Sequence, residues 1–426
     1  MEKFFTAVRL QEELCVGCIN CIKRCPTEAI RVRNGKAVIT KEFCIDCGEC
    51  IRICKHHAKK AVYDSMDLMD KYEYTIALPA PSLYAQMNNL EDVNIVLHGL
   101  KRMGFDDVYE VSSAAELISS YSRSYIERHT DKWPLISTAC PSVTRLIRVR
   151  FPNLIEHLLP IKPPVEVAAM VARKLAMQKT GLPSDQIGIF FISPCPAKVT
   201  AVKYPLGYET SDVDAVLAIK DVYPMLIKCM KEVSSLDEEL EDLAISGKIG
   251  ISWGSSGGEA GGLLTDSYLA ADGIENIIRV LEDMEDQKFT NLEFIELNAC
   301  NGGCVGGILT VENPYVAKVK LKRLRKYMPV ARNHMVISEE DLLWNQEVEY
   351  EPVFTLGDSL TESINLLSQV DRLTHRFPGL DCGSCGAPNC KALAEDIVRK
   401  VAKETDCIHI FREKMSKLSV DLSKEY

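Results

Sequence analysis

Cys300 and Cys304 lie in a loop whose composition suits the binding of a bulky inorganic ligand. An apolar stretch that starts at Phe294 leads directly into this loop, which contains four glycines: Gly302, Gly303, Gly306 and Gly307. The glycines predict that side chains are absent where an inorganic cluster needs room, and that backbone N–H groups are free to donate to its sulfides. The alternative is a glycine-rich turn with two buried thiols, because buried cysteine is common and glycine loops bind many ligands.

Eight further cysteines near the start of the chain form two runs. The first run follows C-x2-C-x2-C-x3-C-P, and the second repeats it 29 residues later with Lys55 in place of the proline. In this spacing three cysteines of a run bind one 4Fe–4S cluster and the fourth binds the other cluster. We therefore expect one cluster on Cys15, Cys18, Cys21 and Cys54, and a second on Cys44, Cys47, Cys50 and Cys25. The segment resembles bacterial two-cluster ferredoxins, and His56 and His57 are expected to be solvated because both quartets are complete.

The residues after 73 alternate between apolar strands and amphipathic helices, which predicts an α/β domain with a largely parallel sheet. Helices are expected over 93–103, 165–177 and 221–233. Three apolar strand candidates end at a cysteine: 134–139 before Cys140, 187–194 before Cys195, and 292–299 before Cys300. Because ligands collect at the carboxyl ends of strands in such sheets, we expect these cysteines and Cys304 to converge.

A last group of cysteines has the spacing C-x2-C-x4-C-x16-C and consists of Cys382, Cys385, Cys390 and Cys407. This spacing can close another cluster if a helix over 391–405 turns back at its end. It resembles the small 4Fe–4S domain of corrinoid iron–sulfur proteins and of some membrane electron-transfer complexes. Cys407 could instead be a thiol that binds no iron, and Cys229 is left over as a buried helical thiol.

These patterns divide the chain into four parts. Residues 1–72 are expected to form a ferredoxin-like α+β domain, 73–345 the α/β domain, 346–378 a connecting arm, and 379–426 a small helical 4Fe–4S domain.

Composition excludes several classes of protein. The chain has 426 residues, of which 46% are hydrophobic and 26% charged, as in a soluble globular protein. A formal charge of -10 without a basic stripe argues against nucleic-acid binding. The sequence contains no run of 18 apolar residues that could span a membrane, and residues 1–14 lack the pattern of a signal peptide. Clustered cysteines without such a signal favour the cytoplasm, where reduced thiols bind metal.

Three motifs of the α/β part resemble the cluster-binding motifs of FeFe (iron-only) hydrogenases in order and separation. They are S-T-A-C-P-S from Ser137, S-P-C-P-A-K from Ser193, and E-L-N-A-C-N-G-G-C-V-G-G from Glu296. The segments 79–82 and 213–217 resemble further family signposts, so the similarity covers about residues 73–320.

The resemblance implies an H-cluster, which is a 4Fe–4S cubane joined to a diiron unit with CO, cyanide and a dithiolate amine. Cys304 would bridge the two parts, and Lys198 would donate to a cyanide ligand. Glu296 is expected to orient its loop, and the glycine-rich stretch over 253–262 to pack near the cluster. The ligands of the cubane would be Cys140, Cys195, Cys300 and Cys304.

The chain departs from the fast members of that family. Ala139 replaces a cysteine that carries protons, and Tyr121 and Ser124 replace two glutamates of the proton path. Ser193 and Asn298 replace methionines that flank the diiron unit, so the pocket should be more polar. The pattern resembles that of the sensory subclass. The alternative is that another proton route compensates for the missing cysteine and glutamates.

The sequence therefore predicts an enzyme of low activity that interconverts H2 with protons and electrons and senses H2 or redox state. The alternative is a non-catalytic iron–sulfur relay or a cluster-assembly factor without the diiron unit. The expected partners are H2, protons, a ferredoxin-like electron carrier or a signalling protein, and a second copy of the chain in a homodimer.

Overall fold

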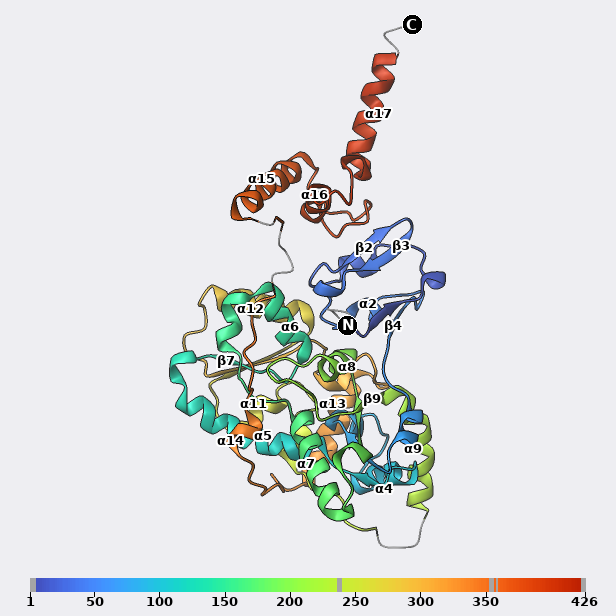
Figure 1. The fold of residues 1–426 in the computed structure, drawn as a ribbon, viewed down its shortest axis with the longest axis vertical. Coiled ribbons are helices and arrows are strands. Elements are labelled where there is room, and N and C mark those ends of the chain that lie inside the picture. Colours follow the sequence, from blue (N-terminus) through green and yellow to red (C-terminus); the bar gives the residue numbers. More distant parts are fainter. Residues whose placement is uncertain (1–4, 236–239, 352–355, 358, 423–426) are drawn as a thin grey trace. The chain divides into compact units, whose positions relative to one another are not determined.

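The computed structural model describes residues 5–235, 240–351, 356–357 and 359–422. These residues form two compact units (Figure 1). Unit one takes its described residues from 1–7, 45–48 and 62–350, and unit two takes them from 8–44, 49–61 and 351–426. Each unit therefore contains segments that are far apart in the sequence.

Unit one contains a four-stranded parallel sheet in the order β6–β5–β8–β9. Every residue of β8 is buried, because Ile189 and Phe191 join the apolar cluster that includes α5 and α7, while Phe190 and Ile192 join the cluster of α4 and α9. Burial on both faces explains why this strand is a continuous apolar run. The strands are β5 (Tyr74–Pro79), β6 (Asp107–Val108), β8 (Ile187–Ser193) and β9 (Ala215–Ala218). The helices are α3 (Pro81–Tyr84), α4 (Asn94–Arg102), α5 (Val111–Arg128), α7 (Pro164–Thr180), α8 (Pro196–Lys203) and α9 (Ile219–Ser234).

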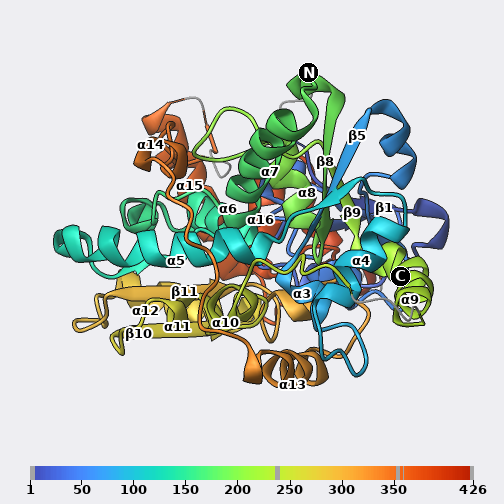
Figure 2. The same cartoon turned by 90° about the horizontal axis from the view of Figure 1, so that it is seen from below.

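A second parallel sheet of unit one has the order β10–β11–β7. Its central strand packs Ile295 and Leu297 against α6 and α12, and Figure 2 shows α10 and α11 beside α5. The strands are β7 (Leu135–Ile136), β10 (Tyr268–Asp272) and β11 (Phe294–Asn298). The remaining helices are α6 (Pro141–Arg150), α10 (Lys248–Ser252), α11 (Gly258–Gly262), α12 (Ile274–Glu285), α13 (Pro314–Leu324) and α14 (Glu339–Leu342).

The first part of unit two is the ferredoxin-like α+β region. Two antiparallel strand pairs enclose an apolar core that contains Val8, Ile22 and several cysteines. Asn34 and Gly35 join β2 to β3 with φ values of 51° and 73°, as a tight hairpin turn requires. The elements are β1 (Val8–Leu10), α1 (Asn20–Lys23), β2 (Ile30–Arg33), β3 (Lys36–Ile39), α2 (Glu49–Arg52) and β4 (Lys59–Ala61).

The second part of unit two is helical and consists of α15 (Leu360–Arg376), α16 (Cys390–Val398) and α17 (Ile408–Leu422). Val370 of α15 packs in one apolar cluster with Leu393 of α16. The helix expected over 391–405 is shorter than predicted, because Lys400 adopts a φ of 63° and Val401 N–H donates to the carbonyl of Asp396 at 2.9 Å, which ends the helix. Among the described residues, no helix combines the length and the apolar character that a membrane span needs.

Within unit two, α16 packs against the β2–β3 hairpin (Figure 1). Arg31 Nε donates to the Asp396 carboxylate at 2.8 Å, and Arg33 donates to the same oxygen. Val32 N–H donates to the carbonyl of Gly386 at 2.8 Å, and a Cβ on Gly386 would lie only 2.0 Å from the Val32 oxygen. Only glycine permits this approach.

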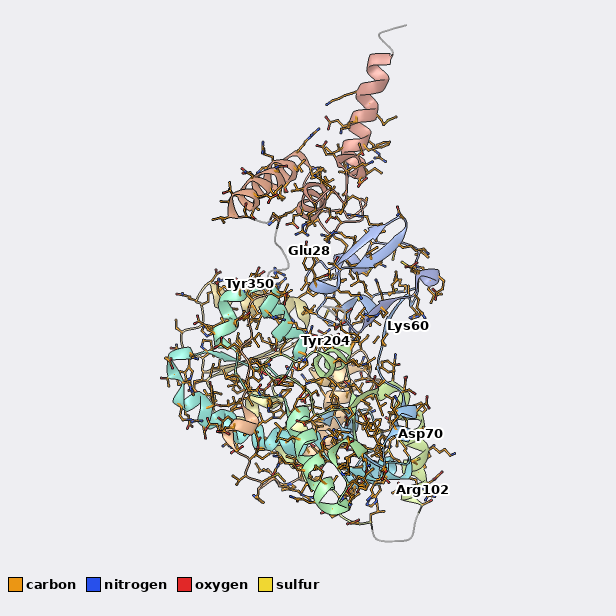
Figure 3. The ribbon with its side chains drawn as sticks, in the orientation of Figure 1. Glu28, Lys60, Asp70, Arg102, Tyr204 and Tyr350 are labelled. Carbon is orange, nitrogen blue, oxygen red and sulfur yellow. The ribbon has the colours of Figure 1, made fainter. Side chains whose placement is uncertain are left out.

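Two polar contacts extend the same interface. Lys23 Nζ donates to the carbonyls of Asp381 at 2.5 Å and Pro388 at 2.9 Å. Asn389 donates to the carboxylate of Glu28, which is labelled in Figure 3, at 2.6 Å. The ferredoxin-like residues and the C-terminal helices are therefore one packed body.

Candidate metal centre

Three cysteines of unit one directly follow parallel strands. Cys140 follows β7 and precedes α6, and Cys195 follows β8 and precedes α8. Each of these helices begins with a proline, which has no N–H to leave unsatisfied at the first helical position. Cys300 follows β11. The three strands belong to two different sheets rather than to one, so the site forms where the carboxyl ends of both sheets meet.

The structure brings three of the predicted ligands together with Lys198. Burial raises the pKa of Cys195 to about 11 and that of Cys304 to about 12. The ammonium of Lys198 opposes both shifts, and the neighbouring Cys140 adds to both. These thiols are therefore protonated in the metal-free protein at neutral pH, and iron binding would release their protons. Cys300 lies in the turn after β11, where its carbonyl accepts from Gly303 N–H at 3.1 Å.

A cavity of about 60 Å³ adjoins Cys304 and Lys198. Its lining also includes Ala139 after β7 and Asn298 at the end of β11, so two of the predicted departures face this space. Lys198 is only 8% exposed, and its Nζ donates to the carbonyl of Ala139 at 2.9 Å. A buried ammonium with a neutral partner is a strong donor for an anionic ligand.

Ser82 supplies a second donor to the same cavity. The residue is fully buried, and its Oγ has no hydrogen-bond partner in the part of the chain that the structure describes. A buried hydroxyl without a partner is destabilising unless a ligand accepts from it. A thiol, an ammonium and an unpartnered hydroxyl around one cavity fit a metal unit with small anionic ligands.

Two buried carboxyl groups line the cavity, and the sequence interpretation missed the role of the first. Glu259 accepts from Ser137 Oγ at 2.6 Å, and burial next to Glu296 raises the pKa of Glu259 to about 8. Glu296 accepts from Gly257 N–H and Ala260 N–H, both at 2.9 Å, so it anchors α11. The sequence signal that could have identified Glu259 was the presence of an acidic residue within the glycine-rich stretch 253–262. We expected this stretch only to pack near the cluster.

Three other predicted positions lie away from the cavity lining. The stretch of α5 that borders the cavity contributes Val111 and Ala115, whereas Tyr121 and Ser124 lie further along the helix. Ser193 is fully buried, and its Oγ accepts from Cys195 N–H at 3.3 Å and donates to the Cys195 carbonyl at 3.1 Å. Ser193 therefore shapes the turn that holds Cys195 and does not line the cavity.

The glycines of the third motif have a different role from the one expected. A Cβ on Gly303 would lie 2.3 Å from the nitrogen of Ser256, and one on Gly307 would lie 2.2 Å from the oxygen of Pro194. These glycines therefore permit close contact between protein backbones, not space for a cluster. Gly303 also has a φ of 87°, which disfavours other residues.

Three cysteine sulfur atoms of the ferredoxin-like region, those of Cys15, Cys25 and Cys54, accept backbone hydrogen bonds. Cys15 Sγ accepts from Ala37 N–H at 3.4 Å, and six cysteines share the apolar core of the ferredoxin-like region. Backbone donors to sulfur are typical of cysteines that bind clusters. Cys47 lies in the segment 45–48, and it packs against the apolar cluster of unit one that also contacts Cys140.

The C-terminal cysteines also converge. Burial raises the pKa of Cys385, and the nearby Cys407 and Cys382 add to the rise, so the three thiols lie near one another despite their separation in sequence. Cys407 is 7% exposed and packs in the same apolar cluster as Cys385 and Cys390. This placement favours Cys407 as the fourth ligand.

Among the described residues, no three histidine, cysteine or acidic side chains surround a single point closely enough to bind one metal ion. Cys229 is buried on α9, and His56 and His57 are exposed, as expected.

Comparison with known proteins gives matches to three family models. Residues 73–268 and 259–308 match the model of the iron only hydrogenase large subunit, C-terminal domain. Residues 7–55 match a 4Fe-4S dicluster domain, and residues 377–409 match a putative Fe-S cluster domain.

Individual relatives are distant. Iron hydrogenase 1 of Clostridium pasteurianum is 23% identical over 389 residues, which cover 76% of this chain and 68% of the relative. The cytosolic Fe-S cluster assembly factor NAR1 of Candida dubliniensis is 24% identical over 143 residues, which cover 30% of this chain and 24% of the relative. A variant of [FeFe]-hydrogenase HydA1 from Chlamydomonas reinhardtii has 15% identity and a TM-score of 0.48, covering 64% of this chain and 88% of that structure. Because the hydrogenase model spans more than half of the chain, the protein belongs to the family of iron-only (FeFe) hydrogenases.

Proposed function

We propose that this chain interconverts H2 with protons and electrons at a low rate, and that it senses H2 or redox state. The observation that carries the proposal is Lys198, a nearly buried ammonium at a cavity that Cys304 also lines. An iron–sulfur relay without cyanide ligands has no need for such a donor. The family membership supports the same chemistry.

The residues of the centre would share the work of holding the cofactor. Cys140, Cys195, Cys300 and Cys304 would bind the cubane, and Cys304 would bridge to the diiron unit. When bound, the diiron unit supplies an open iron position for H2. Lys198 would donate a charge-assisted hydrogen bond to a cyanide ligand, and Ser82 is available to donate a second one.

Low activity follows from the poor supply of proton carriers at the cavity. Ala139 has a methyl group where a thiol would transfer protons, and Val111 and Ala115 are apolar. Proton transfer by a positioned side chain contributes about 10²- to 10⁴-fold to a rate, so its loss is expected to slow turnover strongly. In the described part of the cavity, Glu259 and Glu296 are the remaining acids.

Electrons would pass through the two ferredoxin-like clusters. Their acceptor would be a ferredoxin-like carrier or a signalling protein that reads the cluster state. The packing of the C-terminal cysteines in the same unit as the ferredoxin-like core supports a role for that cluster in the relay.

Infrared spectroscopy of anaerobically matured full-length protein tests the proposal. We expect bands of iron-bound CO and cyanide, and we expect the cyanide bands to shift or weaken in Lys198→Met. Lys203→Met is the matched control, because Lys203 is an exposed lysine on the same helix and pairs with Asp64. Absence of CO and cyanide bands from protein with full iron content would refute the proposal.

The second candidate is a non-catalytic relay or cluster-assembly factor. The similarity to the assembly factor NAR1 over 143 residues favours it. It predicts protein with full 4Fe–4S content, no CO or cyanide bands, and no H2-dependent reduction of an electron acceptor.

A further inference from the structure

The two cysteine runs near the start of the chain form an internal repeat that differs in charge at one buried position. Cys25 Sγ accepts from Ala29 N–H at 3.2 Å, and Cys54 Sγ accepts in the same way from Ala58 N–H at 3.3 Å. The residue after each alanine begins a strand and is 2% exposed: Ile30 in the first run and Lys59 in the second. The second run therefore has an ammonium where the first has an aliphatic side chain.

Lys59 enters the protein interior without a protein partner. Its Nζ is buried and has no hydrogen-bond partner among the residues that the structure describes. Lys60, labelled in Figure 3, is the next residue of β4 and is exposed, as the alternation of side chains along a strand requires. Transfer of an unpaired ammonium out of water costs several kcal/mol. A negative charge is therefore expected beside Lys59.

The charge of Lys59 acts on the first group of cysteines. Ala58, the residue before Lys59, donates its N–H to Cys54 Sγ and packs in one apolar cluster with Cys15 and Cys21. Lys59 therefore begins β4 beside the cysteines expected to bind one cluster, and its ammonium is near enough to act on Cys21. Four thiolates make a 4Fe–4S cluster anionic in both redox states, so this cluster can provide the charge that the buried ammonium lacks.

We propose that Lys59 raises the reduction potential of the cluster on Cys15, Cys18, Cys21 and Cys54, and so makes this cluster the site where electrons collect. Reduction adds one electron and no proton, and a nearby fixed positive charge stabilises the more negative product. The second cluster has Ile30 at the equivalent position and gains no such stabilisation. In a sensory protein the first cluster would then hold the reduced state that a partner reads.

The inference rests on the cluster assignment within the proposed function, but its test needs no diiron unit. The full chain is reconstituted with iron and sulfide and titrated with dithionite, which supplies the electrons, under electron paramagnetic resonance. Lys59→Ile introduces the residue of the other run, and Lys59→Met keeps the length of the side chain. We expect both variants to lower one midpoint potential so that the ratio of reduced to oxidised cluster falls about tenfold at fixed potential, which is about 59 mV.

Two further variants are controls. Lys60→Met removes an exposed charge from the same strand and should change no midpoint potential. Ile30→Lys should raise the potential of the other cluster. Unchanged midpoint potentials in both Lys59 variants at full iron content would overturn the inference. Loss of iron from both variants would also overturn it, because Lys59 would then be needed for assembly and not for the potential. Missing CO and cyanide bands would refute the proposed function alone.

Discussion

Asp396 is expected to hold the C-terminal helices to the ferredoxin-like core, and the substitution Asp396→Asn tests this. The Asp396 side chain is 7% exposed and pairs with both Arg31 and Arg33, whose side chains are 14% and 26% exposed. Asparagine keeps the size of the side chain but removes the charge. Two guanidinium groups would then remain largely buried without an anion.

The magnitude follows from this burial. Removal of one partner from a buried ion pair costs about 3–5 kcal/mol. The two arginines also donate to four backbone carbonyls, those of Glu28, Ile30, Val32 and Cys385, so part of their hydrogen bonding survives. We therefore expect a loss of about 2–3 kcal/mol, which is about a 30- to 150-fold change in a local opening equilibrium.

Hydrogen exchange of the full chain with all clusters reconstituted measures this opening. The amide of Val32 donates across the interface to Gly386, and its exchange should accelerate about 30- to 150-fold in Asp396→Asn. The amide of Gln11, which donates to Ala58 within the ferredoxin-like core, should change little. Asp371→Asn is the control, because Asp371 is an exposed acid on α15. Equal exchange rates of the Val32 amide in Asp396→Asn and Asp371→Asn would refute the reasoning.

Three further substitutions test the hydrogenase centre. Ala139→Cys should raise H2 oxidation about tenfold or more if proton delivery limits turnover; an unchanged rate would place the block elsewhere, for example on α5. Burial beside Glu296 raises the pKa of Glu259 from 4.5 to about 8 against the opposing charge of Lys198, so the folded chain binds a proton that the unfolded chain loses, and stability falls as the pH rises between these values. Glu259→Gln should therefore increase the thermal midpoint relative to the parent chain more at about pH 8 than at about pH 5, and an equal difference at both values would contradict the assignment. Gly307→Ala should reduce iron content, because its Cβ would lie 2.2 Å from the Pro194 oxygen, whereas Gly261→Ala, which meets no atom within 4 Å, should not.

The local spacing of cysteines was enough to predict the ferredoxin-like part. In that part three of the four ligands of each cluster lie within a few residues of one another, so the sequence separation itself limits the distance between their sulfur atoms. The same argument identified the first three C-terminal cysteines. Cysteine spacing could not predict where helix α16 ends, because that end depends on the left-handed backbone conformation of Lys400.

The sequence by itself determined the types of ligand, the order of the motifs and the apolar strands that lead to them. Only the tertiary structure decided that Cys140 and Cys195 follow strands of different sheets, that Glu259 faces the cavity of Cys304, and that Asp396 pairs with Arg31. The physical reason is that strand pairing, burial and charge contacts join residues tens to hundreds of positions apart, and no local pattern records such a contact. Lys59 shows the same limit: its position in the repeat is visible in the sequence, but its burial without a partner is a property of the fold.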